Sequence, residues 1–234
     1  MIWQLLAMVF VHRHFPPPVV VAQEMWDLSI NASLLGDLGK TLVRAGLAFV
    51  CAMILGTALG IVFGRVQWVD RLFSGWLLVG LNLPAIVVAI ALYIWLGLTE
   101  FALILAVVIN KLPLVAATVR EGVRSFSADF DELGAVLRLS PWRRLRLIFV
   151  PQLMPFVLAA ARTGLSLIWK IVLVFEVLGS DGGVGFRISI LFQRFDMAGI
   201  LAYTASFMLV VLAFEYGVMR PIERRVLAWR PVRT

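Results

Sequence analysis

The chain has 234 residues, of which 62% are hydrophobic and only 15% are charged, and its net charge is +7. Soluble domains average about 45–50% apolar and about 25% charged residues, so the composition argues against a soluble globular enzyme, a disordered chain or a disulfide scaffold. A basic excess would suggest nucleic acid in a soluble protein, but in a bilayer protein it is typical of cytoplasmic loops, so we expect a lipid bilayer and no nucleic acid as partner.

The N-terminal region is ambiguous. Ile2–Val11 is apolar over ten residues, about 15 Å of helix and half of a bilayer core. It is either the tail of a first span whose upstream part is absent or a helix at the interface. Pro16-Pro17-Pro18 predicts an extended segment, and Val19–Gly39 is typical of an extramembrane connection.

Five further segments are long enough to cross a bilayer, which takes about 20 apolar residues. They are Ala45–Phe63, Leu72–Leu98, Phe101–Val119, Pro151–Leu178 and Met197–Phe214. Asn82 and Pro84 interrupt the second, and the fourth is the most polar. We therefore predict one all-α, polytopic membrane domain over 1–234, with five spans plus a short or incomplete first one.

The arginines predict the orientation of these spans. If the Arg120–Arg146 loop is cytoplasmic, then the Gly64–Arg71 loop and the tail after Met219 are cytoplasmic too. These three regions hold 13 of the 21 basic residues, against five on the other side. The positive-inside bias is satisfied, and the C-terminus is predicted to be cytoplasmic.

The longest loop, 120–151, is predicted to form two short amphipathic helices. Ser127 is a candidate N-cap, and an apolar stripe follows at spacings of three and four residues. Arg138 is placed in the last turn, and Ser140-Pro141 begins the second helix, which ends where Pro151 starts the next span. The residues alone leave two alternatives: a helix pair resting on anionic lipid, or one docked in a groove of a soluble partner.

Two motifs in this loop resemble a known pattern. Glu132-Leu133-Gly134 and Ile148-Phe149-Val150-Pro151 resemble the EAA loop of binding-protein-dependent ABC importer permeases, which runs Glu-Ala-Ala, three residues, Gly, nine residues, Ile-x-Leu-Pro. The wider likeness is to the nitrate/taurine/sulfonate branch. It is carried by Leu83-Pro84-Ala85, Trp95–Glu100, Trp169–Glu176, Gly183-Val184-Gly185 and Glu223-Arg224-Arg225.

The chain departs from that pattern at the loop glycine, which is Arg138 here. If the glycine serves a turn with positive φ, an arginine is disfavoured there. We therefore expect Arg138 to stay helical and Ser140-Pro141 to make the corner.

The resemblance implies a permease homodimer in a bacterial inner membrane, a dimer of ATP-binding subunits docked on the loop, and a periplasmic or extracellular substrate-binding protein. The partner ATPase would bind ATP and Mg²⁺, and this chain would have no cofactor, metal or catalytic residue. The implied docking residues are Phe130, Glu132, Leu133, Gly134, Leu137, Arg138, Trp142, Ile148 and Pro151.

No nucleotide site is predicted in the chain itself. Gly39-Lys40-Thr41 resembles the end of a phosphate-binding loop, but the glycine required five residues earlier is Leu34. The glycine-rich 179–185 stretch follows a span and is interpreted as an external turn.

Polar residues within spans are candidates for a translocation path, because such residues usually face the bundle interior. Lys170 is the first candidate and would suit a small anion; the others are Asn82, Pro84, Asn110, Lys111 and Glu176. Other interpretations stay open: Glu176 at the outer interface, Lys111 snorkelling, and Asn82 bonded to a neighbouring helix. The competing functions are a membrane scaffold and a secondary transporter without an ATPase, and the substrate is left open.

Overall fold

The structure is a computed structural model and describes residues 3, 15–30 and 33–227, which are helical throughout apart from short connections. Four helices in this part are long and apolar enough to cross a membrane: Leu34–Arg65, Glu100–Arg124, Pro141–Gly179 and Met197–Val226. A fifth span results if the bent pair Gln67–Asn82 and Ala85–Leu96 is one crossing. The all-helical polytopic fold is confirmed, whereas the predicted Ile2–Val11 segment lies outside the described residues apart from Trp3.

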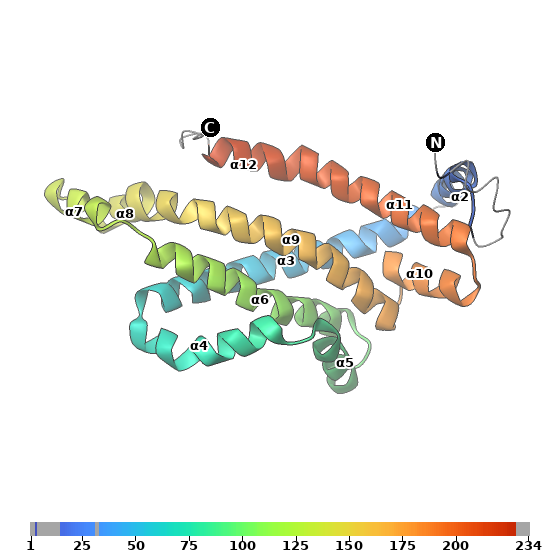
Figure 1. Cartoon of the computed structure of the whole chain (residues 1–234), viewed down its shortest axis with the longest axis horizontal. Helices are drawn as coiled ribbons and strands as arrows, with labels where there is room; N and C mark the ends of the chain where they lie inside the picture. The colour runs from blue at the N-terminus through green and yellow to red at the C-terminus, as the bar shows by residue number, and fades with distance from the viewer. Residues whose placement is uncertain (1–2, 4–14, 31–32, 228–234) are drawn as a thin grey trace.

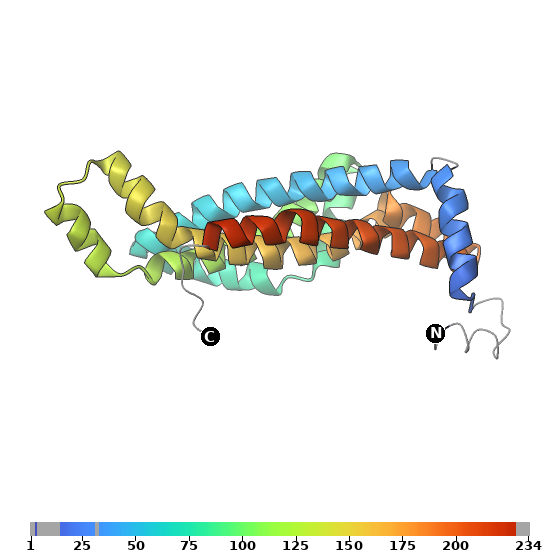
Figure 2. The ribbon, with the colours of Figure 1, turned by 90° about the horizontal axis from the view of Figure 1, so that it is seen from above.

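The long helices lie roughly side by side along one axis, whereas α2 runs across that axis (Figures 1 and 2). In chain order they are α2 (Pro18–Ile30), α3 (Ser33–Arg65), α4 (Gln67–Asn82), α5 (Ala85–Leu96), α6 (Glu100–Arg124), α7 (Ala128–Val136), α8 (Pro141–Arg144), α9 (Val150–Gly179), α10 (Val184–Gln193), α11 (Met197–Phe214) and α12 (Arg220–Leu227). The α7–α8 corner projects from one end, which we call the corner end; α2 and α10 lie at the other, which we call the outer end after the orientation predicted from the arginines. The predicted extramembrane connection Val19–Gly39 is therefore mostly helix.

Glycines on α3 allow it to pack closely against α6. Gly56, Gly60 and Gly64 recur every four residues, so they lie on one face of the helix. A Cβ built on Gly60 would lie 2.6 Å from Val119 Cβ, and its two neighbours face Val115 and Val123 in the same way. Small residues let membrane helices approach until dispersion contacts are made along their length. This glycine face makes α3 and α6 a tightly packed unit.

The expected span Leu72–Leu98 is not one straight helix. Its two halves, α4 and α5, meet at an angle of 95° across Leu83 and Pro84. Proline has no N–H for the helix ladder, and its ring disfavours helical geometry in the preceding residue. Leu83 is accordingly extended, with φ −65° and ψ 125°.

The predicted second loop helix is not a separate element. Helix α8, the π-helical turn Leu145–Phe149 and α9 form one continuous helix over Pro141–Gly179. A second π-helical turn, Glu215–Met219, joins α11 to α12. Each π-helical turn ends two residues before a proline, Pro151 or Pro221. Since a proline cannot donate and crowds the carbonyl four residues back, widening the preceding turn lets the helix continue through it.

We expect Gly60→Val to destabilise the protein, because the new side chain would overlap Val119 and force α3 away from α6. Overpacking of this kind costs about 1–3 kcal/mol. The midpoint of thermal unfolding of the purified protein in detergent would measure it. Gly46→Val is the matched control on the same helix, since a Cβ there meets no atom within 4 Å. Equal midpoints for the two variants would contradict close packing at Gly60.

Candidate functional site

The corner between α7 and α8 is closed by a helix C-terminal motif rather than by Ser140-Pro141 alone. The Leu139 N–H donates to Gly134 O at 3.0 Å, and the Arg138 N–H donates to Ala135 O at 3.0 Å. This is the Schellman pattern, whose turn residue has a left-handed backbone. Arg138 is that residue, with φ +47°. The prediction that Arg138 lies in the last helical turn is therefore wrong: it takes the glycine conformation without being glycine.

The predicted starts of the two loop helices are confirmed in position but not in their capping hydrogen bonds. Ser127 and Ser140 stand at the N-cap positions of α7 and α8, and Pro141 opens α8 as predicted. Neither serine side chain makes a capping hydrogen bond.

The nine predicted docking residues divide by exposure. Gly134 and Ile148 are buried, because Ile148 packs over Gly134, where a Cβ would lie 2.8 Å from Ile148 Cδ1. They hold α7 against the α8–α9 helix and are not available to a partner. Pro151 is half-buried within that helix. The exposed members are Phe130, Glu132, Leu133, Leu137, Arg138 and Trp142.

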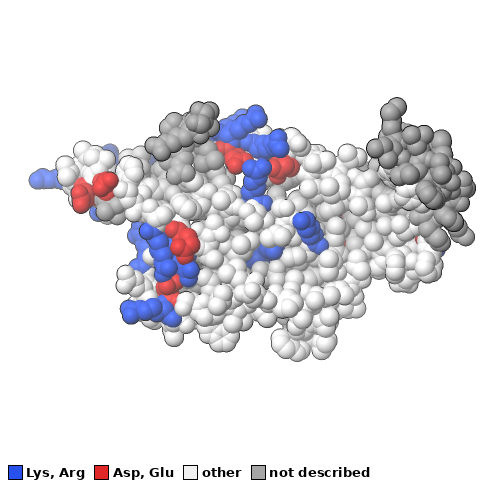
Figure 3. Space-filling view, in the orientation of Figure 1, with Lys and Arg blue, Asp and Glu red and all other residues white. Residues whose placement is uncertain are grey.

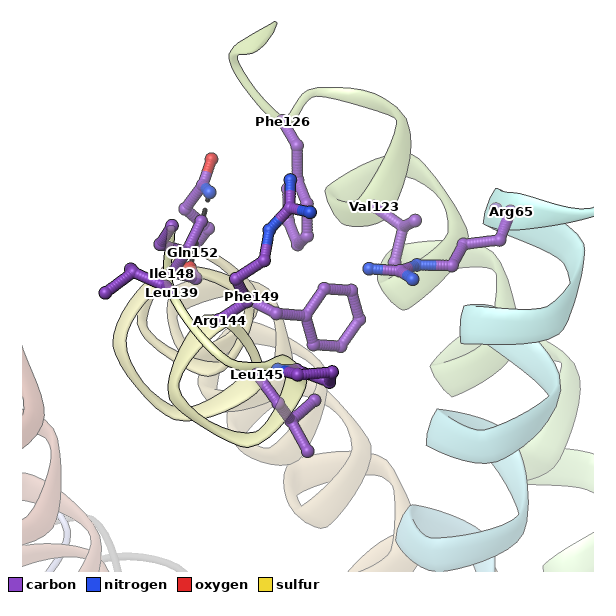
Figure 4. Close-up of a pocket in the computed structure, with 11 residues that line it drawn as sticks. Arg65, Val123, Phe126, Leu139, Arg144, Leu145, Ile148, Phe149 and Gln152 are labelled. Atoms are coloured by element: carbon purple, nitrogen blue, oxygen red, sulfur yellow. Dashed lines mark hydrogen bonds between the residues drawn. The ribbon is translucent and has the colours of Figure 1, made fainter. Parts of the chain in front are cut away.

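Behind the corner lies a cavity of about 910 Å³ between α8 and the corner ends of α3 and α6 (Figure 4). Phe126 and Phe149 both line it and meet edge to face at its wall, with ring centroids 5.2 Å apart. The Arg65 guanidinium lies over the Phe149 ring, 4.3 Å from its centroid, a favourable cation–π contact. The Gln152 amide oxygen accepts the Ser127 N–H at 3.3 Å. These contacts connect the corner to three helices of the bundle.

A cluster of ion pairs joins the start of α4 to the corner end of α6. The buried Asp70 carboxylate accepts from Arg120 at 3.2 Å and also contacts Arg124. Asp70 lies in the first turn of α4, where a negative charge is favoured by the helix dipole.

At the outer end, a network of buried polar side chains joins five helices, α3, α6, α9, α10 and α11. Its centre is Glu176 of α9, which has no exposed surface. Its carboxylate accepts from Arg44 Nη1 at 2.8 Å, from the Gly185 N–H at 2.9 Å and from Thr41 Oγ1 at 2.9 Å. The Gly185 amide lies in the first turn of α10, whose partial positive charge favours an anion. Glu176 is thus an internal partner for α10 and has no surface to line a path.

Arg44 of α3 connects this carboxylate to the other elements. Its guanidinium pairs with both oxygens of Glu100 at the start of α6 and donates to Asp181 at 2.9 Å. It also donates to the Gly182 carbonyl. Arginine suits such multiple contacts better than lysine, because its planar guanidinium holds five N–H donors in a fixed arrangement.

Asp37 anchors a second part of the network. It accepts from Arg187 Nε at 2.7 Å, from Tyr203 Oη at 3.1 Å and from the Gly183 N–H at 3.2 Å. The hydrogen bond to Asp37 raises the pKa of Arg187 above its ordinary value. Gly183 has φ +100°, and a Cβ there would lie 2.4 Å from Glu176 Oε1, so only glycine fits. The 179–185 stretch holds the turn between α9 and α10, and its amides bind the protein's own carboxylates.

A charged loop residue, Asp181, completes the network at its rim. Partial desolvation favours its neutral form, but the charges of Lys40 and Arg44 outweigh this and lower the pKa of the carboxyl.

The six predicted path residues do not converge on one site. Glu176 belongs to the outer network. Asn82 and Pro84 lie at the α4–α5 bend, where the Asn82 amide donates to Leu78 O of its own helix at 2.9 Å. Lys111 is buried and Asn110 half-buried on α6. Lys170 is exposed and borders a cavity between α9 and α11.

Sequence reasoning missed Asp37, Thr41 and Arg44, because hydropathy started the first long span at Ala45. The signal was present: these residues recur at spacings of four and three, which places them on one face of α3. Their partners could not be read from the chain, since Glu176 lies 132 residues beyond Arg44.

Comparison with known proteins decides the family. Residues 52–227 match the model of the binding-protein-dependent transport system inner membrane component. The chain belongs to this family. Such proteins are the permease subunits of ABC transporters, whose ATPase is a separate subunit.

Individual proteins similar to this chain are also ABC transporter permeases or share their fold. The chain is 26% identical to the putative aliphatic sulfonates transport permease protein SsuC of Bacillus subtilis, over 98% of this chain and 83% of that protein. It is 24% identical to the taurine transport system permease protein TauC of Escherichia coli, over 97% and 82%. The fold matches the inward-facing MetNI methionine ABC transporter with a TM-score of 0.71 at 16% identity, covering 85% of this chain and 98% of that one.

We expect Arg138→Gly to stabilise the corner by about 1 kcal/mol, because glycine adopts positive φ without the Cβ penalty. The exchange rate of the Leu139 amide hydrogen, which bonds to Gly134 O, should fall about fivefold. Arg143→Gly is the control: it replaces an exposed arginine inside α8 and should destabilise by roughly 0.5–1 kcal/mol. Faster exchange in Arg138→Gly would contradict the assigned turn.

We expect Arg44→Met to lower stability by about 3–5 kcal/mol, because it leaves the Glu176 carboxylate buried without its cation. Thermal unfolding in detergent would measure the loss. Asp181→Asn removes another partner of Arg44, but the Asp181 side chain is 76% exposed, so it should cost at most about 1 kcal/mol. The double variant Arg44→Met, Glu176→Gln should recover part of the loss; no recovery would mean that the charge pair is not what Arg44 stabilises.

Proposed function

We propose that this chain is the transmembrane subunit of an ATP-driven importer of small organic anions, with the α7–α8 corner as the docking element for the ATP-binding subunits. Two copies of the chain would form the permease, and the partner ATPase would bind ATP and Mg²⁺. A binding protein would deliver solute at the outer end. The sulfonate and taurine permeases among its relatives support this substrate class.

The observation that carries the proposal is the exposed apolar surface of the corner. Leu137 is 59% exposed, Val136 79% and Trp142 69% on an element that projects from the bundle. Apolar side chains gathered in this way mark a site of interaction with a partner. The acidic Glu132 and Asp129 beside them favour a protein partner over anionic lipid. Apolar anchors surrounded by charges suit a helix docked in a groove.

The distribution of charge supports placing the corner and the C-terminus in the cytoplasm of a bacterial inner membrane. On the face drawn in Figure 3, charged side chains of both signs gather over α12, over α7–α8 and at the corner end of α6, while the middle shows basic side chains only in an otherwise uncharged surface. Thirteen basic residues fall in the three regions assigned to this side, as the positive-inside bias requires.

The residues proposed for the translocation path are not equally supported by the structure. Lys170 stays the first candidate, because it is exposed at a cavity far from either end of α9. Asn110, Lys111, Asn82 and Pro84 are secondary candidates on α6 and at the bend. We propose no path contact for Glu176.

We expect Trp142→Ala to weaken the complex with the cognate ATP-binding subunit at least about tenfold, because exposed tryptophans at interfaces are common anchors. Co-purification from mild detergent and titration of the ATPase would measure it. Trp76→Ala, a similarly exposed tryptophan on α4 (73%), is the control and should bind normally. Uptake by this chain in vesicles without any ATPase would instead show a secondary transporter, and an assembled complex without uptake a scaffold.

A further inference from the structure

A second cavity, of about 410 Å³, lies between α9, α10 and α11. Its size falls within the range of small-molecule sites. Trp169 and Phe207 form part of its wall; both are buried, and their rings meet edge to face with centroids 6.0 Å apart. Nine of the fourteen lining residues are apolar. A ligand here would place an apolar body against the aromatic pair.

The polar lining residues follow one line along α9. Arg162, Ser166 and Lys170 recur every four residues, so they share a face and span about 12 Å. Leu165, Trp169 and Leu173 run beside them on the apolar side. The pocket is therefore amphipathic along its length.

The charges of the pocket do not balance. Arg162 is matched by Glu215 at 3.4 Å and Glu223 at 3.0 Å. Within the part of the chain that the structure describes, Lys170 has no carboxylate at ion-pair distance. An ammonium group away from the helix ends is costly unless something supplies the negative charge.

The position of Lys170 argues against a lipid headgroup as that anion. Lys170 lies nine residues before the end of α9 at Gly179, about 14 Å along the helix. It is twenty residues from the start of α9, about 30 Å away. Headgroups lie at the surfaces of a hydrocarbon core about 30 Å thick, so at this depth the anion must come through the protein.

We propose that this pocket binds an organic monoanion with an apolar body, its anionic head on Lys170 and its apolar part against Trp169 and Phe207. The assignment rests on the proposed transport function and makes its substrate class narrower. A bare inorganic anion such as nitrate would leave the apolar wall against water. A zwitterion would bring an ammonium group to a site whose carboxylate, Glu215, already faces Arg162.

The position of Trp169 allows a direct test by fluorescence. The probe is 6-bromohexane-1-sulfonate, whose bromine quenches nearby indoles, added to the complex with its ATPase in nanodiscs of uncharged phosphatidylcholine. We expect saturable quenching that Trp169→Phe abolishes. Lys170→Gln should weaken binding about tenfold, as expected for a lost charge-assisted contact. Lys40→Gln, a lysine outside the pocket, should bind the probe normally.

Two further measurements test the pocket without relying on the Lys170→Gln variant. Met208→Phe narrows the pocket without changing a charge and should weaken the bromohexanesulfonate probe. Unlabelled hexanesulfonate should displace the probe, while nitrate and taurine at equal concentration should not. Absence of saturable quenching, or equal affinity in Lys170→Gln, would overturn the proposal.

Two other occupants would also overturn it. Quenching by brominated phosphatidylglycerol that hexanesulfonate does not relieve would show a lipid groove. A disulfide between copies carrying Ser166→Cys and Cys51→Ser would show that a second copy closes the pocket. Failure of the ATPase to assemble would refute the proposed function, whereas a hydrolysing complex that ignores the probe would refute only this pocket.

Discussion

The outer half of the molecule depends on one buried carboxylate, Glu176. Its side chain has no exposed surface, so water cannot solvate the charge and the protein must supply every partner. Arg44 and Thr41 of α3 and the Gly185 amide of α10 do so. The same requirement explains the glycines between α9 and α10, because only backbone without a Cβ can approach the carboxylate.

The two ends of the bundle differ in character: the corner end exposes apolar side chains, and the outer end contains a network of buried polar side chains. Helix α9 connects them. Its continuous helix, Pro141–Gly179, starts at the exposed corner, passes the Lys170 pocket and reaches the outer network. A displacement at the corner would therefore be carried along one rigid element, next to the α3–α6 pair held together by its glycine face. Coupling between the ends must be reciprocal, so occupancy at one end must also alter the affinity at the other.

Prolines have three different effects in this chain, depending on their neighbours. At Pro84 the helix breaks, because Leu83 becomes extended. Before Pro151 and Pro221 it continues, because the preceding turn widens. Pro113 stays inside α6, packed in the position where a Cβ of Gly80 would lie. The identity of the residue alone does not decide between these outcomes; the packing around it does.

The sequence by itself determined the features that depend on local composition: an all-helical membrane protein, most of its spans, the corner and the family that its motifs resemble. Tertiary structure decided how Arg44 and Glu176 pair, how α4 and α5 bend and where Lys170 points. Hydropathy averages over a window and treats every charged residue as unfavourable in a span. It therefore does not account for an oppositely charged partner, distant in the sequence, that compensates the burial of that charge. Arg138 shows the same limit for the backbone: helix propensity favours α-helix there, but the packing of Ile148 on Gly134 brings the chain round in a left-handed turn.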